Sequence, residues 1–286
     1  MKQRIITGAV LVLLLLIFIF LSGTIVYPLI ITLLAVAGTY EMMECIDVKN
    51  VPYITIPSLV FSALCTFIAS RYRYGVLSAF VVCYLFVMLF MLVFAHDKVD
   101  PVSASAAFMF TTYITICFTC LVKLRYVTTD PGSNTGDPIG QYVYLLVFAG
   151  AWVTDTFAYF TGYLFGKHKL CPNISPKKTV EGALGGVVFC VIAYLIYGFV
   201  LSKMLPVVPN YIGIAIVAVV VSFLSQTGDL LASVIKRKYG IKDYGKIFPG
   251  HGGVLDRFDS ILLVSPFLLL LVEDAQYLSA LVKVIQ

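Results

Sequence analysis

Long apolar runs, separated by short polar connections, extend from the start of the chain to residue 273. Each run has about 17 to 23 residues, enough for an α-helix to cross a hydrocarbon core about 30 Å thick. About nine such spans are predicted, at 5–21, 24–41, 53–70, 76–95, 104–122, 141–164, 182–204, 210–232 and 257–273. The pattern therefore predicts an all-α, polytopic integral membrane protein.

The composition supports this fold class. Hydrophobic residues make up 60% of the chain and charged residues only 12%, and the mean hydropathy of +0.97 excludes an ordinary soluble domain. The net charge of +5 does not predict nucleic-acid binding, because no separate soluble module carries it. Cys117 and Cys120 lie inside an apolar run without a second pair or a nearby histidine, so they predict neither a metal nor a redox site.

The first run follows a charged opening, Met-Lys-Gln-Arg, as in a signal peptide. No small-x-small cleavage site follows it, and a second span comes at once. We therefore expect a retained first helix rather than a cleaved signal.

Lysine and arginine gather in two connections. The first holds Lys167, Lys169, Lys177 and Lys178, and the second holds Lys236, Arg237, Lys238, Lys242, Lys246 and Arg257. Two spans separate these connections, so both lie on one face, and basic connections tend to stay in the cytoplasm. Nine spans then place the N-terminus inside. Against the rule, four basic residues fall outside, at Arg71, Arg73, Lys123 and Arg125.

One apolar run carries a stripe of polar side chains. The stripe recurs at three- and four-residue intervals and shares one helical face, with Ser222, Ser225, Gln226, Asp229, Ser233 and Lys236. A carboxylate inside a membrane span costs several kcal/mol unless it is paired, hydrated or metal-bound, so Asp229 marks a functional site. The structural alternative is a hydrogen bond between helices.

A second carboxylate, Asp256, stands at the start of the last span and can face Asp229. Two carboxylates amid lysines and arginines predict a Mg²⁺ site, because Mg²⁺ is usually held by one or two carboxylates plus substrate phosphates. The surrounding cations then take the remaining phosphate charge. Asp243 and Asp259 are expected to be ligands, neighbours of ligands or ion-pair partners.

Two further segments carry candidate phosphate-binding groups. The turn at 249–253, Pro-Gly-His-Gly-Gly, lets the backbone approach an anion because glycine admits positive φ angles, and its His251 is either functional or an ordinary structural histidine. Donors also precede the span at 182–204, an arrangement that binds phosphate at a helix N-terminus: Ser175, Lys177, Lys178 and Thr179. Asp155 is another carboxylate inside a span, and Gly162 and Gly166 predict close helix packing.

The run 233–259 resembles, position for position, the signature of the phosphatidate cytidylyltransferases, also called CDP-diacylglycerol synthases. The matching residues are Ser233, Lys236, Arg237, Lys242, Asp243, Gly245, Pro249, His251, Gly252, Gly253, Asp256, Arg257 and Asp259. The region 155–182 is also similar to that family, whereas the N-terminal half is similar only in hydropathy. We therefore expect a transmembrane scaffold at 1–125 and a catalytic transmembrane region at 126–286.

The resemblance implies a Mg²⁺-dependent enzyme of phospholipid biosynthesis in the inner (cell) membrane, with its active site on the cytoplasmic face. It would condense CTP with phosphatidic acid to CDP-diacylglycerol and pyrophosphate. The implied metal ligands are Asp229 and Asp256. The implied catalytic residues are Asp229, Ser233, Lys236, Arg237, Lys242, His251, Asp256, Arg257 and Asp259, and the implied phosphate-binding residues are Ser175, Lys177, Lys178, Thr179, Gly252 and Gly253. His251 is expected to position groups rather than act as a base, because the attacking phosphate is already ionised.

Two other functions stay open. A CTP-dependent kinase of a polyprenol or other lipid needs similar chemistry, but the complete signature weighs against it. An ion-coupled transporter is suggested by Asp155 and Asp229 inside spans, but no inverted repeat supports it. A homodimer is expected only from the general frequency of symmetric dimers.

Overall fold

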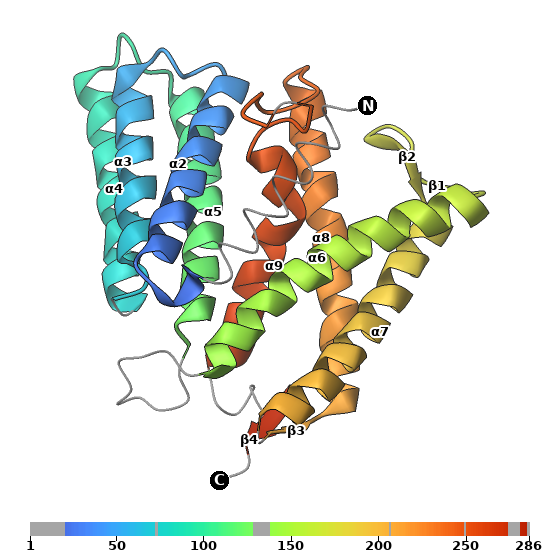
Figure 1. The fold of residues 1–286 in the computed structure, drawn as a ribbon. Helices are drawn as coiled ribbons and strands as arrows, with labels where there is room; N and C mark the ends of the chain where they lie inside the picture. The colour runs from blue at the N-terminus through green and yellow to red at the C-terminus, as the bar shows by residue number, and fades with distance from the viewer. Residues whose placement is uncertain are drawn as a thin grey trace. The chain divides into compact units, whose positions relative to one another are not determined.

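The computed structural model of the chain describes residues 21–71, 74–127, 138–205, 207–248, 250–273 and 281–284. Within these ranges the chain forms eight α-helices, a short 3-10 turn, η1 (Leu21–Gly23), and four short strands (Figure 1). The helices are α2 (Val26–Cys45), α3 (Pro52–Ile68), α4 (Tyr74–Phe94), α5 (Pro101–Arg125), α6 (Pro138–Phe165), α7 (Val180–Met204), α8 (Tyr211–Lys238) and α9 (Leu255–Glu273).

Every predicted span from 24–41 onward coincides with one of these helices. The span predicted at 5–21 lies outside the described residues, apart from Leu21 in η1. The start of α5 follows ordinary capping chemistry. Asp100 caps α5 by accepting a 2.8 Å hydrogen bond from the Ser103 N–H, and Pro101 occupies the first turn, where its missing N–H costs nothing.

Six of the described helices are long and apolar enough to cross a membrane, namely α2, α4, α5, α6, α7 and α8. Helix α3 is apolar but has only 17 residues, and α9 carries the charged residues Asp256 and Arg257 in its first turn. Large apolar side chains are exposed on the described helices, among them Phe94 of α4 and Tyr163 of α6, as expected for surfaces that contact lipid tails. The protein is therefore a helical membrane protein.

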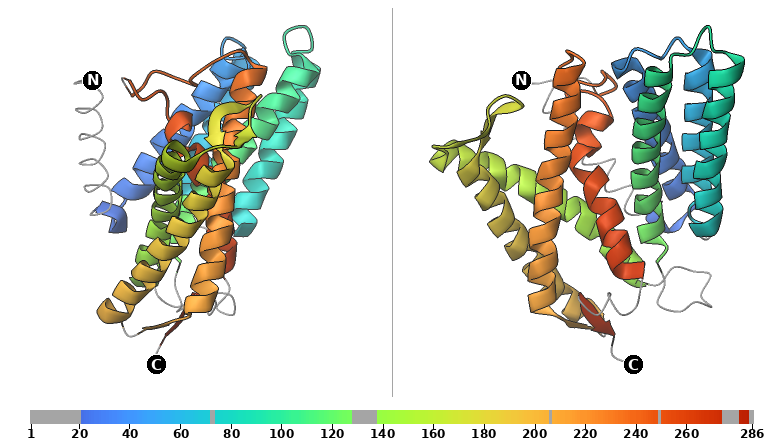
Figure 2. Two further views of the ribbon diagram at one scale, coloured as in Figure 1. Left: turned by 90° about the vertical axis from the view of Figure 1, so that its right-hand side faces the viewer. Right: turned by 180° about the vertical axis from the view of Figure 1, so that it is seen from behind.

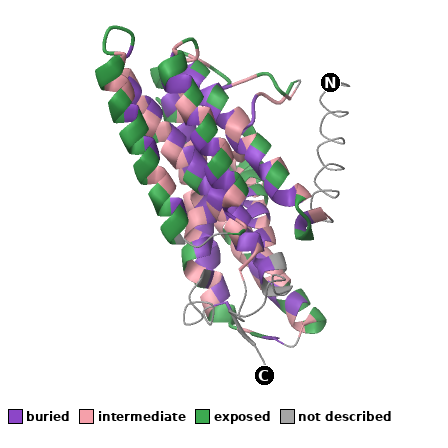
Figure 3. Cartoon of the chain, turned by 90° about the vertical axis from the view of Figure 1, so that its left-hand side faces the viewer, coloured by how far each residue is buried: buried purple, intermediate pink, exposed green. Residues whose placement is uncertain are grey.

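The helices form two compact units, and the division falls within α8 and α9. Unit 1 combines residues 1–126 with 235–258. In it α2 packs on α3 and α5, and α3 packs on α4, with exposed residues on the outer faces (Figure 3). The buried Tyr27 hydroxyl donates a 2.9 Å hydrogen bond to the Leu121 carbonyl, which fastens α2 to α5.

Unit 2 combines residues 127–234 with 259–286, and its main contact is between α6 and α7. Glycines let these helices approach closely. A Cβ built on Gly162 would lie 3.4 Å from the Gly182 Cα, and one on Gly186 would lie 3.0 Å from the Thr154 carbonyl oxygen. The predicted packing role of Gly162 is confirmed.

Two small antiparallel sheets were not part of the all-α prediction. Strands β1 (Lys169–Cys171) and β2 (Ser175–Thr179) form a hairpin between α6 and α7, seen in Figure 2. Strand β3 (Val207–Pro209) pairs with β4 (Val282–Val284) near the end of the chain. Strands this short contain too few residues to show an alternating pattern, so hydropathy does not reveal them.

The predicted division at residue 125 concerns function and stays a prediction. In space, the segment 235–258, which carries most of the family-like signature, belongs to the same compact unit as the N-terminal helices.

Candidate active site

The signature segment leaves α8 and turns back through two glycine-dependent bends. Gly240, two residues after the end of α8, has a φ of +69°, and Gly250 and Gly252 have φ values of +77° and +83°. Side chains strongly disfavour this backbone region, whereas glycine enters it freely. The Phe248 N–H donates to the Gly252 carbonyl at 2.9 Å, which closes the second bend ahead of α9.

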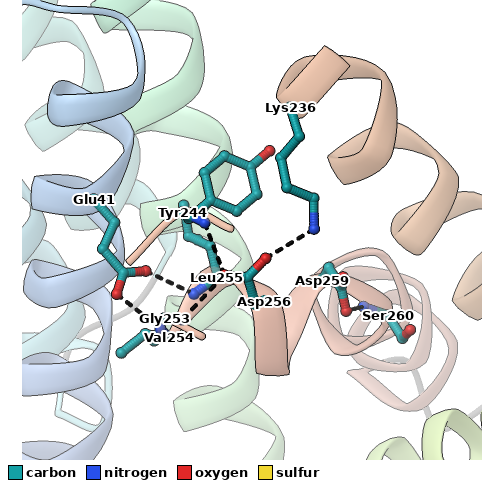
Figure 4. Close-up of polar contacts among 9 residues, drawn as sticks. All are labelled: Glu41, Lys236, Tyr244, Gly253, Val254, Leu255, Asp256, Asp259 and Ser260. Carbon is teal, nitrogen blue, oxygen red and sulfur yellow. Dashed lines mark hydrogen bonds and ion pairs between the residues drawn. The ribbon is translucent and has the colours of Figure 1, made fainter. Parts of the chain in front are cut away.

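Asp256 lies at the centre of this segment, in the first turn of α9. One carboxylate oxygen accepts hydrogen bonds from the Tyr244 N–H at 2.8 Å and the Gly253 N–H at 3.0 Å (Figure 4). The other forms an ion pair with Lys236 Nζ at 2.8 Å. The Asp256 side chain is only 3% exposed, so these three partners replace the water it has lost.

Lys236 reaches Asp256 from the last turn of α8, and its side chain is 14% exposed. Its ammonium group also lies 5.3 Å from the centroid of the Tyr244 ring, a cation–π distance. Lys236 and Asp256, which the sequence assigns to phosphate and to metal, are thus brought together in unit 1.

A third charged group in unit 1 was missed by the sequence reasoning. Glu41 of α2 is 2% exposed, and its carboxylate accepts 2.9 Å hydrogen bonds from the Val254 and Leu255 N–H groups (Figure 4). The rule that singled out Asp155, a carboxylate within a predicted span, applies equally to Glu41 at the end of the span 24–41. The signal was therefore present in the sequence.

In unit 2, Asp229 forms an ion pair with Lys178. Asp229 comes from α8 and Lys178 from β2, so the hairpin between α6 and α7 brings the lysine to the helix. Both side chains are about one quarter exposed, at 29% and 26%. As in unit 1, a carboxylate predicted to bind metal, Asp229, is paired with a lysine predicted to bind phosphate, Lys178.

Two more predicted carboxylates lie in unit 2. Asp155 of α6 accepts a 3.0 Å hydrogen bond from the Ser260 hydroxyl, and Asp259 accepts a 2.8 Å hydrogen bond from the Ser260 N–H. Gly228 lets α8 approach α9 at this point, because a Cβ there would collide with the Asp259 carbonyl oxygen. Ser260 therefore connects two carboxylates from different helices.

The donors that precede α7 have mixed environments. Thr179 caps the helix by accepting a 3.1 Å hydrogen bond from the Gly182 N–H. Glu181 accepts hydrogen bonds from the Lys167 and His168 N–H groups, so its carboxylate binds the backbone between α6 and β1. Ser175 is paired within the hairpin, and Lys177 is exposed.

The remaining predicted residues differ in exposure. Arg237, Lys242 and Arg257 are exposed, and Ser233 is half-buried. His251 Nδ1 is buried, and it has no hydrogen-bond partner within the described part of the chain. Part of the polar stripe on α8 serves helix packing, since Gln226 donates to the Ala183 carbonyl and to Ser222.

The pairing of carboxylates with lysines determines what the site can do. Among the described residues, no group of three or more His, Cys, Asp or Glu side chains is arranged to hold a metal ion. Asp229 and Asp256 belong to different units, and each offers carboxylate oxygens, the ligand type that Mg²⁺ prefers in proteins. Lys178 and Lys236, which now neutralise these carboxylates, carry ammonium groups of the kind that bind phosphate oxygens.

Comparisons with known proteins agree with this chemistry. Residues 2–274 match the model of the Cytidylyltransferase family. A phosphatidate cytidylyltransferase of Bacillus subtilis is 34% identical over 281 residues, covering 94% of this chain and 96% of the relative. Proteins of the same name from Staphylococcus epidermidis and Staphylococcus aureus are 34% and 31% identical, covering 94% and 96% of this chain and 97% and 100% of the relatives. The chain belongs to the cytidylyltransferase family.

Proposed function

We infer that this protein is a phosphatidate cytidylyltransferase, which converts CTP and phosphatidic acid to CDP-diacylglycerol and pyrophosphate. The full-length match to relatives of that name carries the inference. The site supports it, since the signature residues Lys236 and Asp256 are paired in unit 1 and Lys178 and Asp229 are paired in unit 2.

The reaction needs little covalent chemistry from the protein. A phosphate oxygen of phosphatidic acid forms a new bond to the α-phosphorus of CTP, and the bond from that phosphorus to the bridging oxygen breaks as pyrophosphate leaves. The nucleophile is already ionised, so no strong base is required. Positioning and charge neutralisation therefore account for most of the rate enhancement.

The paired lysines and carboxylates and the exposed cations of the signature segment would share this work. Lys236 and Lys178 would leave their carboxylates and bind phosphate oxygens of the entering substrate. Exposed cations of the same segment, Arg237, Lys242 and Arg257, would hold the remaining phosphate charge. We propose that Asp229 and Asp256 then hold Mg²⁺, which when bound would offset charge on the triphosphate.

The finer topology is part of the proposal. With a first span at 5–21, the chain would have about nine spans and an inside N-terminus. The basic connections around Lys178 and Lys236 would then lie in the cytoplasm, where CTP is available, while the lipid would enter from the bilayer. A homodimer stays a prediction.

Purified protein in detergent, supplied with CTP, phosphatidic acid and Mg²⁺, tests the function directly. We expect release of pyrophosphate together with lipid-linked CMP. A lipid kinase would release CDP instead, and an ion-coupled transporter would release neither. Either of those results would overturn the proposed activity.

A further inference from the structure

Glu41 is a buried carboxylate that the proposed reaction does not yet use. It lies in α2 at 2% exposure, and within the described part of the chain it forms no ion pair. A charge in such a place is costly unless its oxygens are satisfied. Both oxygens are satisfied by the Val254 and Leu255 N–H groups, which open α9 and carry the positive end of its dipole.

The surroundings of Glu41 are shaped to receive this turn. Gly38, one helical turn earlier, makes room for Leu255, because a Cβ there would lie 3.0 Å from the leucine Cδ2. Gly245 and Gly253 border the carboxylate, and a Cβ at either would collide with it. Glycines on both sides therefore let the carboxylate approach the backbone closely.

Glu41 and Asp256 divide three consecutive N–H groups between them. Gly253 donates to Asp256, while Val254 and Leu255 donate to Glu41. The turn that Glu41 holds is thus the same turn that orients Asp256. Since Asp256 is paired with Lys236, a shift of this turn moves both groups.

We propose that Glu41 is a positioning residue for the cytidylyltransfer reaction: through the 253–255 turn it fixes Asp256 and Lys236 in the geometry that binds the metal–triphosphate. This role rests on the proposed function. It assigns part of the active site to the N-terminal region, which the sequence suggested was only scaffold.

Glu41→Gln tests the role with little change in size. The amide keeps one acceptor but presents an N–H₂ group where Val254 or Leu255 donates, so at least one hydrogen bond is lost. We expect the KM for CTP to rise by about 10- to 100-fold, the usual cost of removing a group that orients a ligand-binding side chain. A partly unfolded preparation would lower kcat but leave this KM unchanged, so KM separates positioning from mere stability.

Glu44→Gln is the matched control, with the same chemical change one turn along α2. Glu44 is 47% exposed and pairs with Lys49, so its variant should keep the wild-type KM. A second measurement without substrates follows tryptic cleavage after Lys242 and Lys246 in the folded protein. Cleavage should be faster in Glu41→Gln, because the turn that anchors this segment is loosened, and unchanged in Glu44→Gln.

The outcomes separate the two proposals. If the wild type turns over and Glu41→Gln keeps the wild-type KM for CTP, only the role of Glu41 is overturned. If the wild type forms no lipid-linked CMP, the proposed function fails and this role fails with it. Should Glu41→Gln not fold, Glu41→Asp retains the charge with a shorter reach, and a wild-type KM in that variant also overturns the role.

Discussion

At the scale of single residues, the two carboxylates Asp229 and Asp256 of the candidate site each have a charged partner in this structure. Asp256 has two backbone donors and Lys236, and Asp229 has Lys178. Breaking a buried pair such as Asp256–Lys236 by removing one partner leaves an uncompensated charge, which typically costs about 3–5 kcal/mol. These pairs therefore shape the folded protein as well as its chemistry.

We expect Asp229→Asn and Asp256→Asn each to lower turnover by more than about 100-fold, the scale on which removal of a preorganised charged element acts. Pyrophosphate release by the purified variants measures this. Asp97→Asn provides the control, because Asp97 is exposed in the connection after α4. Near wild-type turnover in both site variants would contradict the metal assignment.

Gly252 and Gly240 form a matched pair for a second test. Both have positive φ, so alanine at either position costs about 1–2 kcal/mol of backbone strain. Only at Gly252 does the new Cβ also meet a carboxylate oxygen, 2.8 Å away on Asp256, whereas nothing lies within 4 Å at Gly240.

Gly252→Ala should therefore lose about tenfold or more in turnover, since a disturbance of about 1.4 kcal/mol in the transition state is tenfold in rate. Gly240→Ala should lose stability alone. Thermal unfolding and turnover, measured on the same preparations, check the expected loss of turnover in Gly252→Ala and the loss of stability alone in Gly240→Ala. Equal losses of turnover in the two variants would show that strain, and not Asp256, is responsible.

At the scale of helices, close approach depends on missing side chains. Helices α6 and α7 meet where Gly162 faces Gly182, and a Cβ on Gly182 would lie 2.6 Å from the Ala158 carbonyl oxygen. Thr179 caps α7 beside this contact, one residue after the lysine that pairs with Asp229. The helix contact thus supports the hairpin that presents Lys178.

Gly182→Ala should lower the stability of the protein by about 1–3 kcal/mol, the usual cost of overpacking a close contact. Gly75→Ala in α4 is the control, because no atom lies within 4 Å of the new Cβ and its effect should stay below about 1 kcal/mol. Thermal unfolding in detergent compares the two. An unchanged midpoint for Gly182→Ala would mean that the helices are not held at this distance.

Hydropathy predicted the position of each described α-helix, with helix ends displaced by up to six residues, as at the end of α8, because length and apolarity suffice to identify a membrane helix but not its exact ends. It did not predict the strands, whose pairing depends on partners up to about eighty residues away, as for β3 and β4. The roles of Lys178 and Lys236 as partners of Asp229 and Asp256 were not predicted either. Spacing along one helix does not report which side chain from another segment will approach it.

At the scale of the whole molecule, the protein combines phosphate chemistry with helices that expose many large apolar side chains. Six described helices can cross a membrane, while the signature segment 239–254 between α8 and α9 is polar and rich in glycine. Such a segment cannot lie unprotected in hydrocarbon, because its backbone groups need partners. The reacting phosphates and the lipid tails can thus be accommodated by different parts of one chain.

Removal of divalent metal with EDTA should abolish turnover, and excess Mg²⁺ should restore it. The unfolding temperature of the protein without substrates should stay unchanged, because Asp229 and Asp256 already have lysine partners. Turnover that persists in EDTA would contradict the Mg²⁺ requirement. A large drop in unfolding temperature would instead indicate a structural metal.

The lysine partners of Asp229 and Asp256 also have a consequence for selectivity. If Asp229 and Asp256 hold Mg²⁺ as proposed, a divalent ion without nucleotide would have to displace the ammonium group that already neutralises each carboxylate, so it would bind weakly. Nucleotide that arrives with its own ion offers each lysine a new anion in exchange. Under the proposed Mg²⁺ assignment, the enzyme would therefore bind the metal–nucleotide complex in preference to the free ion.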